Sequence, residues 1–138
     1  SYSLASPPRL VPEGERADLI VSGMLLSQLC VQPKLAARRL YEKRLGAFPA
    51  PLVKVWDELE LGMQKDHIDA LTNDAELAVL TSDVIHRSGG ETWSVVGAER
   101  LEERVPAFQQ VLARATWSWP RVRGAVETSV DALLLRRR

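Results

Sequence analysis

The longest uncharged stretch of the chain lies within residues 18–32. Apolar residues there cover most of the circumference of a 3.6-residue period, and the polar exceptions are small. The uncharged length, roughly 20 Å as a helix, is well below the roughly 30 Å hydrocarbon core of a bilayer. We therefore expect a central helix that is buried on several sides and does not span a membrane.

Other segments repeat apolar residues at helical spacing. Leu52, Val55, Trp56, Leu59 and Met63 fall at i, i+3, i+4, i+7 and i+11, which is typical of an amphipathic helix. Glycines and prolines separate these segments and are fitting places for helices to stop or start. The further helices expected are residues 34–45, 52–63, 75–87, 101–115 and 121–138, with a kink or break at Pro106.

Residues 91–96 are the only stretch with even a brief strand pattern. No second strand is predicted to pair with it, so we expect a loop. Residues 1–11, which include the pair Pro7–Pro8, predict an extended arm. The expected fold class is all-α: one domain at residues 12–138, a bundle of five to seven helices, preceded by the N-terminal arm at 1–11.

The composition is that of an ordinary globular domain, with 138 residues, 46% hydrophobic, 26% charged and a formal net charge of zero. A zero net charge removes the simplest electrostatic case for a nucleic-acid-binding domain, because such domains usually carry a basic excess. The single cysteine, Cys30, cannot form an internal disulfide. We therefore expect a soluble intracellular protein in a reducing compartment, either cytoplasm or organelle matrix.

The sequence contains no phosphate-binding glycine loop, no Gly-x-Ser-x-Gly elbow and no paired cysteines. Asp83 and His86 are three residues apart and would share one face of a helix, as in carboxylate-bridged di-iron bundles. Such sites need a second acid-x-x-His pair, and His67 has Gln64 in that position. We therefore predict no catalytic residue, no cofactor and no metal site, and the protein is not expected to be an enzyme.

Charges are segregated along the chain. Acidic residues crowd positions 57–83, whereas basic residues dominate 34–44 and 114–138. Such segregation orients a partner that carries the opposite pattern. It is equally compatible with neutralisation inside the fold, where a basic helix lies against an acidic one.

The most suggestive cluster combines tryptophan and arginine, the residue types most enriched at binding hot spots. On a regular helix two tryptophans separated by one residue cannot both face the same way, so at least one is a candidate for exposure. The alternative is that both pack in the core at a helix corner. The predicted partner-binding residues are Arg114, Trp117, Trp119, Arg121, Arg123, Arg38 and Arg39.

These observations favour a non-catalytic helical interaction protein, an accessory subunit or assembly factor of a larger protein complex, without a transmembrane segment. The alternative is a helical nucleic-acid-binding or regulatory protein that uses the basic segments 34–44 and 114–138.

Overall fold

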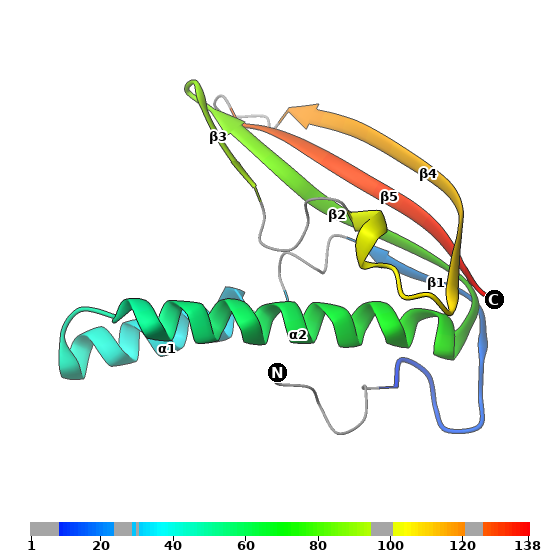
Figure 1. The fold of residues 1–138 in the computed structure, drawn as a ribbon, viewed down its shortest axis with the longest axis horizontal. Helices are drawn as coiled ribbons and strands as arrows, with labels where there is room; N and C mark the ends of the chain where they lie inside the picture. Colours follow the sequence, from blue (N-terminus) through cyan, green and yellow to red (C-terminus); the bar gives the residue numbers. More distant parts are fainter. Residues whose placement is uncertain (1–8, 24–28, 30, 95–100, 121–125) are drawn as a thin grey trace.

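The computed structural model describes residues 9–23, 29, 31–94, 101–120 and 126–138. These residues form two α-helices, a short 3₁₀ helix and a five-stranded sheet, arranged as shown in Figure 1. The expected all-α bundle of five to seven helices is therefore wrong, and the described residues form a mixed α/β fold in which strand is more abundant than helix.

The sheet has the strand order β1-β2-β5-β4, and β3 also pairs with β2. The strands are β1 (Ala17–Gly23), β2 (Ala75–Ser88), β3 (Glu91–Ser94), β4 (Gln109–Pro120) and β5 (Glu127–Arg137). β1 runs parallel to the first half of β2, whereas β3 pairs antiparallel with the last residues of the same edge of β2. β5 pairs antiparallel with both β2 and β4, so β4 is an edge strand.

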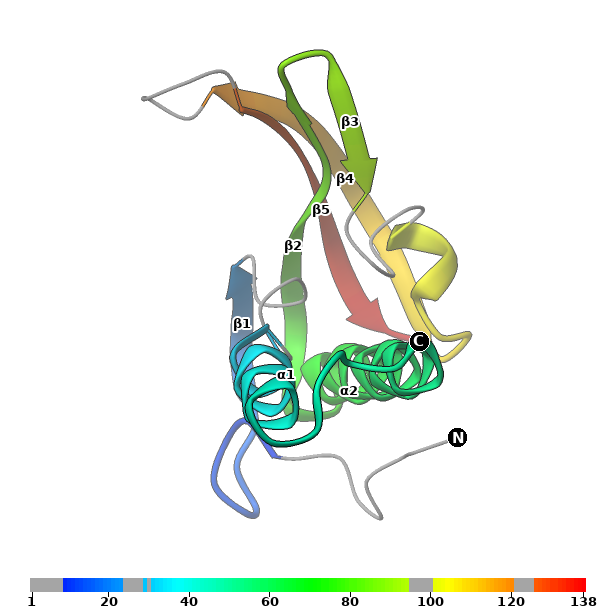
Figure 2. The same ribbon diagram turned by 90° about the vertical axis from the view of Figure 1, so that its left-hand side faces the viewer.

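The helices α1 (Val31–Leu45) and α2 (Ala50–Asp74) connect the two parallel strands. The helix predicted at 34–45 is confirmed, and Gly46 ends it with a φ of 90° that favours glycine. The helix predicted at 52–63 is also confirmed but extends further at both ends. α2 begins after Pro49 with Pro51 in its first turn, where a missing N–H costs no hydrogen bond. The two helices lie side by side below the sheet (Figure 2).

The helix predicted at 18–32 is wrong, because Ala17–Gly23 is strand β1 and α1 begins only at Val31. An uncharged apolar run of this length fits a strand followed by a connection as well as it fits a helix, and periodicity alone does not separate the two. Within β1 only Ser22 is buried. Residues 24–28 and Cys30 lie outside the described residues.

Residues 75–87 form β2 instead of a helix, and the loop expected at 91–96 contains β3. Gly89 and Gly90 have φ values of 57° and 84°, and they form the two-residue turn of a hairpin between these strands. The glycines that suggested the end of a helix therefore mark a hairpin.

The helices predicted at 101–115 and 121–138 are wrong as well. Leu101–Arg104 form the 3₁₀ helix η1, and Pro106 precedes a turn closed by the hydrogen bond from the Gln109 amide to the Pro106 carbonyl, 2.9 Å. Strand β4 follows at once, and β5 supplies the C-terminal strand. Pro106 thus separates η1 from β4 and does not kink a long helix.

The core lies on one face of the sheet. Alternate residues of β2 and β5 face α2 and η1, as the pleat of a strand requires. The fully packed cluster consists of Ile68, Leu71, Ala78, Leu80, Leu101, Leu133 and Leu135. Since α2 and η1 pack on the same side, the described helices leave the opposite side of the sheet uncovered.

The single-domain boundary at 12–138 stays a prediction. Residues 1–8 of the expected arm lie outside the described residues. The end of the arm contacts the fold, because the Leu10 amide donates a hydrogen bond to the Asp74 carboxylate, which also lies 3.5 Å from the Arg9 guanidinium.

Candidate interaction surface

The uncovered side of the sheet, which we call the open face, consists of alternate residues of β1, β2, β5 and β4. It lies opposite α2 and η1 and carries apolar side chains where a solvated face would carry polar ones. The described residues of its central part are all uncharged: Leu19, Val21, Leu77, Val79, Thr81, Ala132, Leu134, Ala113 and Ala115. Arg136 marks one end of this part and Asp83 the other.

The open face is uneven. On β1, Leu19 is 51% and Val21 64% exposed, so their side chains form a ridge. Toward the opposite edge of the same face, a shallow apolar depression of about 170 Å³ lies over β4 and β5. Its open-face residues are Val79, Ala113, Ala115, Ala132 and Leu134. Solitary exposed apolar residues are common in proteins, but a contiguous apolar face is typical of an interaction site.

Trp117 extends this face along β4. It is 39% exposed and lies across from Val130 of β5. Because β4 is a strand, the helical argument that separated Trp117 from Trp119 does not hold. The surroundings of the Trp119 side chain lie outside the described residues, as do Arg121 and Arg123.

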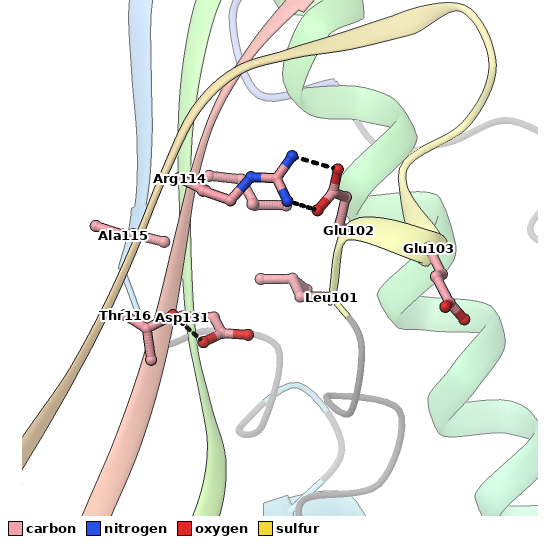
Figure 3. Close-up of a pocket in the computed structure, with 9 residues that line it drawn as sticks. Leu101, Glu102, Glu103, Arg114, Ala115, Thr116 and Asp131 are labelled. Carbon is pink, nitrogen blue, oxygen red and sulfur yellow. Dashed lines mark hydrogen bonds and ion pairs between the residues drawn. The ribbon is translucent and has the colours of Figure 1, made fainter.

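Arg114 is separated from Trp117, because it projects from the other side of β4. Its guanidinium binds the Glu102 carboxylate in two contacts, 2.7 Å and 2.8 Å (Figure 3). The predicted cluster of tryptophan and arginine is therefore divided between the two faces of one strand, and Arg114 already has an acidic partner within the fold.

A cavity of about 620 Å³ lies between η1 and strands β4 and β5, lined by both apolar and charged residues, with the Arg114–Glu102 pair at its edge (Figure 3). Within the cavity lining, the Thr116 hydroxyl donates a hydrogen bond of 2.9 Å to the Asp131 carboxylate. Glu103 is the remaining charged residue of the lining. Glu102 is engaged by Arg114 and Asp131 by Thr116, so most of the charged groups of the lining have a partner within it.

The basic helix α1 has no buried residue. Arg38, a predicted partner-binding residue, forms a surface pair of 2.8 Å with Glu42. Arg39, the other, is exposed together with Lys43 and Arg44, and these three have no ion pair with any described residue. Arg38 and Arg39 therefore lie on a different element from Trp117 and do not belong to the open face.

Neutralisation within the fold accounts for part of the charge segregation. Lys34 of α1 lies 2.9 Å from Asp57 and 3.6 Å from Glu60 of α2. Burial tends to lower the pKa of Lys34, but the hydrogen bond and charge of Asp57 raise it above its ordinary value. Burial raises the pKa of Glu60, and Lys34 opposes this shift. A basic helix therefore does lie against an acidic one.

Both histidines make side-chain hydrogen bonds, buried for His67 and partly buried for His86. His67 Nε2 lies 2.7 Å from the hydroxyl of Ser22, and burial lowers the pKa of His67 below its ordinary value. The pair resembles a nucleophile and its base, but Ser22 is 1% exposed, so a substrate has no access to it. The pair links β1 to α2 and has a structural role.

His86 lies between Asp83 and Thr128: Nε2 is 3.2 Å from the Asp83 carboxylate and Nδ1 is 3.0 Å from the Thr128 hydroxyl. In a regular strand residues 83 and 86 would face opposite sides, but β2 shifts register between Asp83 and Ile85. This bulge brings the two side chains together on the open-face side. Thr128 is buried, and the described residues contain no group of three potential metal ligands.

The chain was compared with protein-family models, curated proteins and solved structures, and no significant match was found. Among the described residues, no helix has the length and apolar character needed to cross a membrane. The interpretation of function therefore depends on the surfaces described above.

The open face was missed in the sequence because its strands were interpreted as helices. One signal could have found it. Gly89–Gly90, between two segments rich in β-branched residues, is a hairpin signal, and it would have placed 75–88 in a sheet.

Proposed function

We propose that this chain is a non-catalytic interaction protein, an accessory subunit or assembly factor of a larger protein complex, that binds through its open face. The observation that carries the proposal is the uncharged surface across β1, β2, β5 and β4, with Val21 and Trp117 substantially exposed. Burying such a face contributes roughly 25 cal/mol per Å² of apolar area removed from water. A protein surface is the partner best suited to a broad, nearly uncharged face.

The arrangement of the polar groups supports a binding role over catalysis. The buried hydroxyls of Ser22 and Thr128 each contact a histidine, but neither is accessible to a substrate. Of the carboxylates around the η1 cavity, Glu102 is engaged by Arg114 and Asp131 by Thr116. Ser22 and His67 link β1 to α2, whereas His86 and Thr128 lie on the open-face side.

The experiment that tests the proposal is the mass of the protein isolated gently from its native source, measured by light scattering on a sizing column. We expect a mass well above 15.4 kDa with a protein-like ratio of absorbance at 260 and 280 nm. Val21→Asp places a charge on the open face and should release the chain as a monomer.

Leu45→Asp is the matched control, because Leu45 is exposed at the end of α1 and lies outside the open face. It should leave the assembly intact. A wild-type monomer would refute the proposal, and loss of the assembly in the Leu45 variant alone would place docking on the helices instead.

Nucleic-acid binding has one supporting observation, the three basic residues of α1 that have no ion pair within the described part of the chain. In the other predicted segment, 114–138, Arg114 binds Glu102, and Arg137 contacts Phe108 and Asn73. If α1 bound phosphates, affinity for heparin would fall steeply with salt, and replacing Arg39, Lys43 and Arg44 by glutamine would abolish it. We expect weak heparin retention and little effect of these replacements.

A further inference from the structure

We propose that a second copy of this chain covers the open face, in a two-fold dimer that places β1 of each copy over β4 and β5 of the other. The inference rests on the proposed function, because it names the protein that occupies the same surface. It follows from the register of the four strands, the relief of the face and its charge.

The strand register aligns one row of residues across the sheet. Val21 of β1 pairs with Val79 of β2, Val79 pairs with Leu134 of β5, and Leu134 pairs with Ala113 of β4. Val21, Val79 and Leu134 alternate with residues that pack on the core, so their side chains point to the open face. On β4 the register shift between Val111 and Ala113 places Ala113 across from Leu134, on the same face. The most exposed residue of β1 and an alanine of β4 therefore lie at the same level along the strands.

The relief of the face is complementary along this row. Leu19 and Val21 form a ridge at one edge of the sheet, and they are the most exposed large apolar side chains of the sheet. The alanines Ala113, Ala115 and Ala132 form the floor of the apolar depression at the other edge. At the level of this row, large side chains at one edge and alanines at the other are what a self-complementary surface requires.

A two-fold axis that runs parallel to the strands, above the open face and between β2 and β5, would bring the exposed residues of β1 in one copy onto the depression of the other. Rotation about it preserves the level along the strands and reverses the strand order β1-β2-β5-β4, so β1 of one copy lies over β4 of the other. Packed sheets cross at about 30°, which shifts the level by about one residue at the edges. Val21 of each copy then faces Ala113 and Ala115 of the other.

The charge distribution permits this arrangement. The described residues of the central open face carry no charge, so two copies bring no like charges together there. With strands about 4.8 Å apart and about 3.4 Å per residue, this part measures roughly 20 Å by 20 Å, or about 400 Å² per copy. An interface of that size is at the small end for proteins, so the dimer should be weak and reversible.

The test is light scattering on the purified full chain between about 10 µM and about 1 mM, the range expected for a small interface. The wild-type mass should rise from 15.4 kDa toward twice that value. Val21→Asp and Ala113→Lys should each raise the dissociation constant at least tenfold and leave the circular dichroism spectrum unchanged, because both side chains are exposed.

Mixing the two variants tests the arrangement itself. In a mixed dimer, Asp at position 21 of one copy meets Lys at position 113 of the other, and the second contact retains valine against alanine. The mixture should therefore dimerise more tightly than either variant alone. A mass of 15.4 kDa at every concentration, a dimer insensitive to Val21→Asp, or no rescue on mixing would each overturn the inference.

The outcome is separable from that of the proposed function. A purified chain that stays monomeric, together with a larger assembly from the native source, would overturn the second copy as partner but retain an interaction protein with a different one. Monomers in both experiments would overturn both. A dimer formed by edge pairing of β4 would not respond to Val21→Asp, and it too would overturn the inference.

Discussion

Leu133 and Leu134 are neighbours on β5 that face opposite sides of the sheet, and they allow a direct test of where the core lies. Leu133 is 4% exposed and packs in the core cluster with Ile68 and Leu71, whereas Leu134 belongs to the open face. Each is replaced by alanine in turn. The two variants remove the same atoms one residue apart, so they differ only in the face that loses them.

For Leu133→Ala we expect the free energy of unfolding to fall by about 3 kcal/mol, within the range for buried leucines, because the loss of transfer free energy is joined by a cavity. For Leu134→Ala we expect about 1 kcal/mol, since its surroundings are open to water and can rearrange. In a domain of this size, the first change should lower the melting temperature by roughly 10 °C and the second by a few degrees.

The assay is urea unfolding followed by circular dichroism at a concentration low enough to keep the chain monomeric. If the slope of the unfolding free energy against urea concentration is the same in both variants, they differ in stability alone. Equal losses for the two leucines, or a larger loss for Leu134, would refute the assignment of the core to the face that carries Leu133. A helix at 121–138, with both leucines near one apolar stripe, would give such an equal result.

Three further outcomes are expected. Trp117→Ala should cost only about 1 kcal/mol of stability and impair assembly, whereas a loss of about 3 kcal/mol on unfolding would make Trp117 a core residue. His86→Ala should cost about 2 kcal/mol, because the buried Asp83 carboxylate loses a hydrogen bond; with Asp83→Ala added, the combined loss should be smaller than the sum, and strict additivity would contradict the pair. The folded protein disfavours protonated His67, so the unfolded chain binds more protons below pH about 6.5, and stability should fall as pH drops through that value toward the lower folded pKa. His67→Gln should flatten this dependence in urea unfolding between about pH 5 and pH 7, and an unchanged slope would contradict it.

The two α-helices were predictable because their signals are local. Gly46, Pro49 and Pro51 stop one helix and start the next, and the side chains of α1 and of the first half of α2 repeat at helical spacing. Such signals act within one or two turns and need no distant partner. The absence of the common catalytic motifs was equally readable from the sequence.

The candidate surface was only partly predictable. Trp117 was selected as a binding residue because of its type, and it lies on the open face; Arg114 was selected with it and lies on the opposite side of β4. Whether two residues share a face depends on the period of the element. The wrong period therefore placed Trp117 and Trp119 apart and hid Val21 completely.

The sequence by itself determined the two α-helices, and it showed none of the common catalytic motifs. Only the tertiary structure decided that 17–23, 75–88, 109–120 and 127–137 are strands. A strand is stabilised by hydrogen bonds to neighbours that are remote in sequence, as Ala17 is from Ala75. The sequence of a short apolar segment therefore does not show which strand it pairs with. The same long-range register decides that Val21, Val79, Leu134 and Ala113 form one row on an uncovered face, because each strand exposes its residues according to the partner beside it.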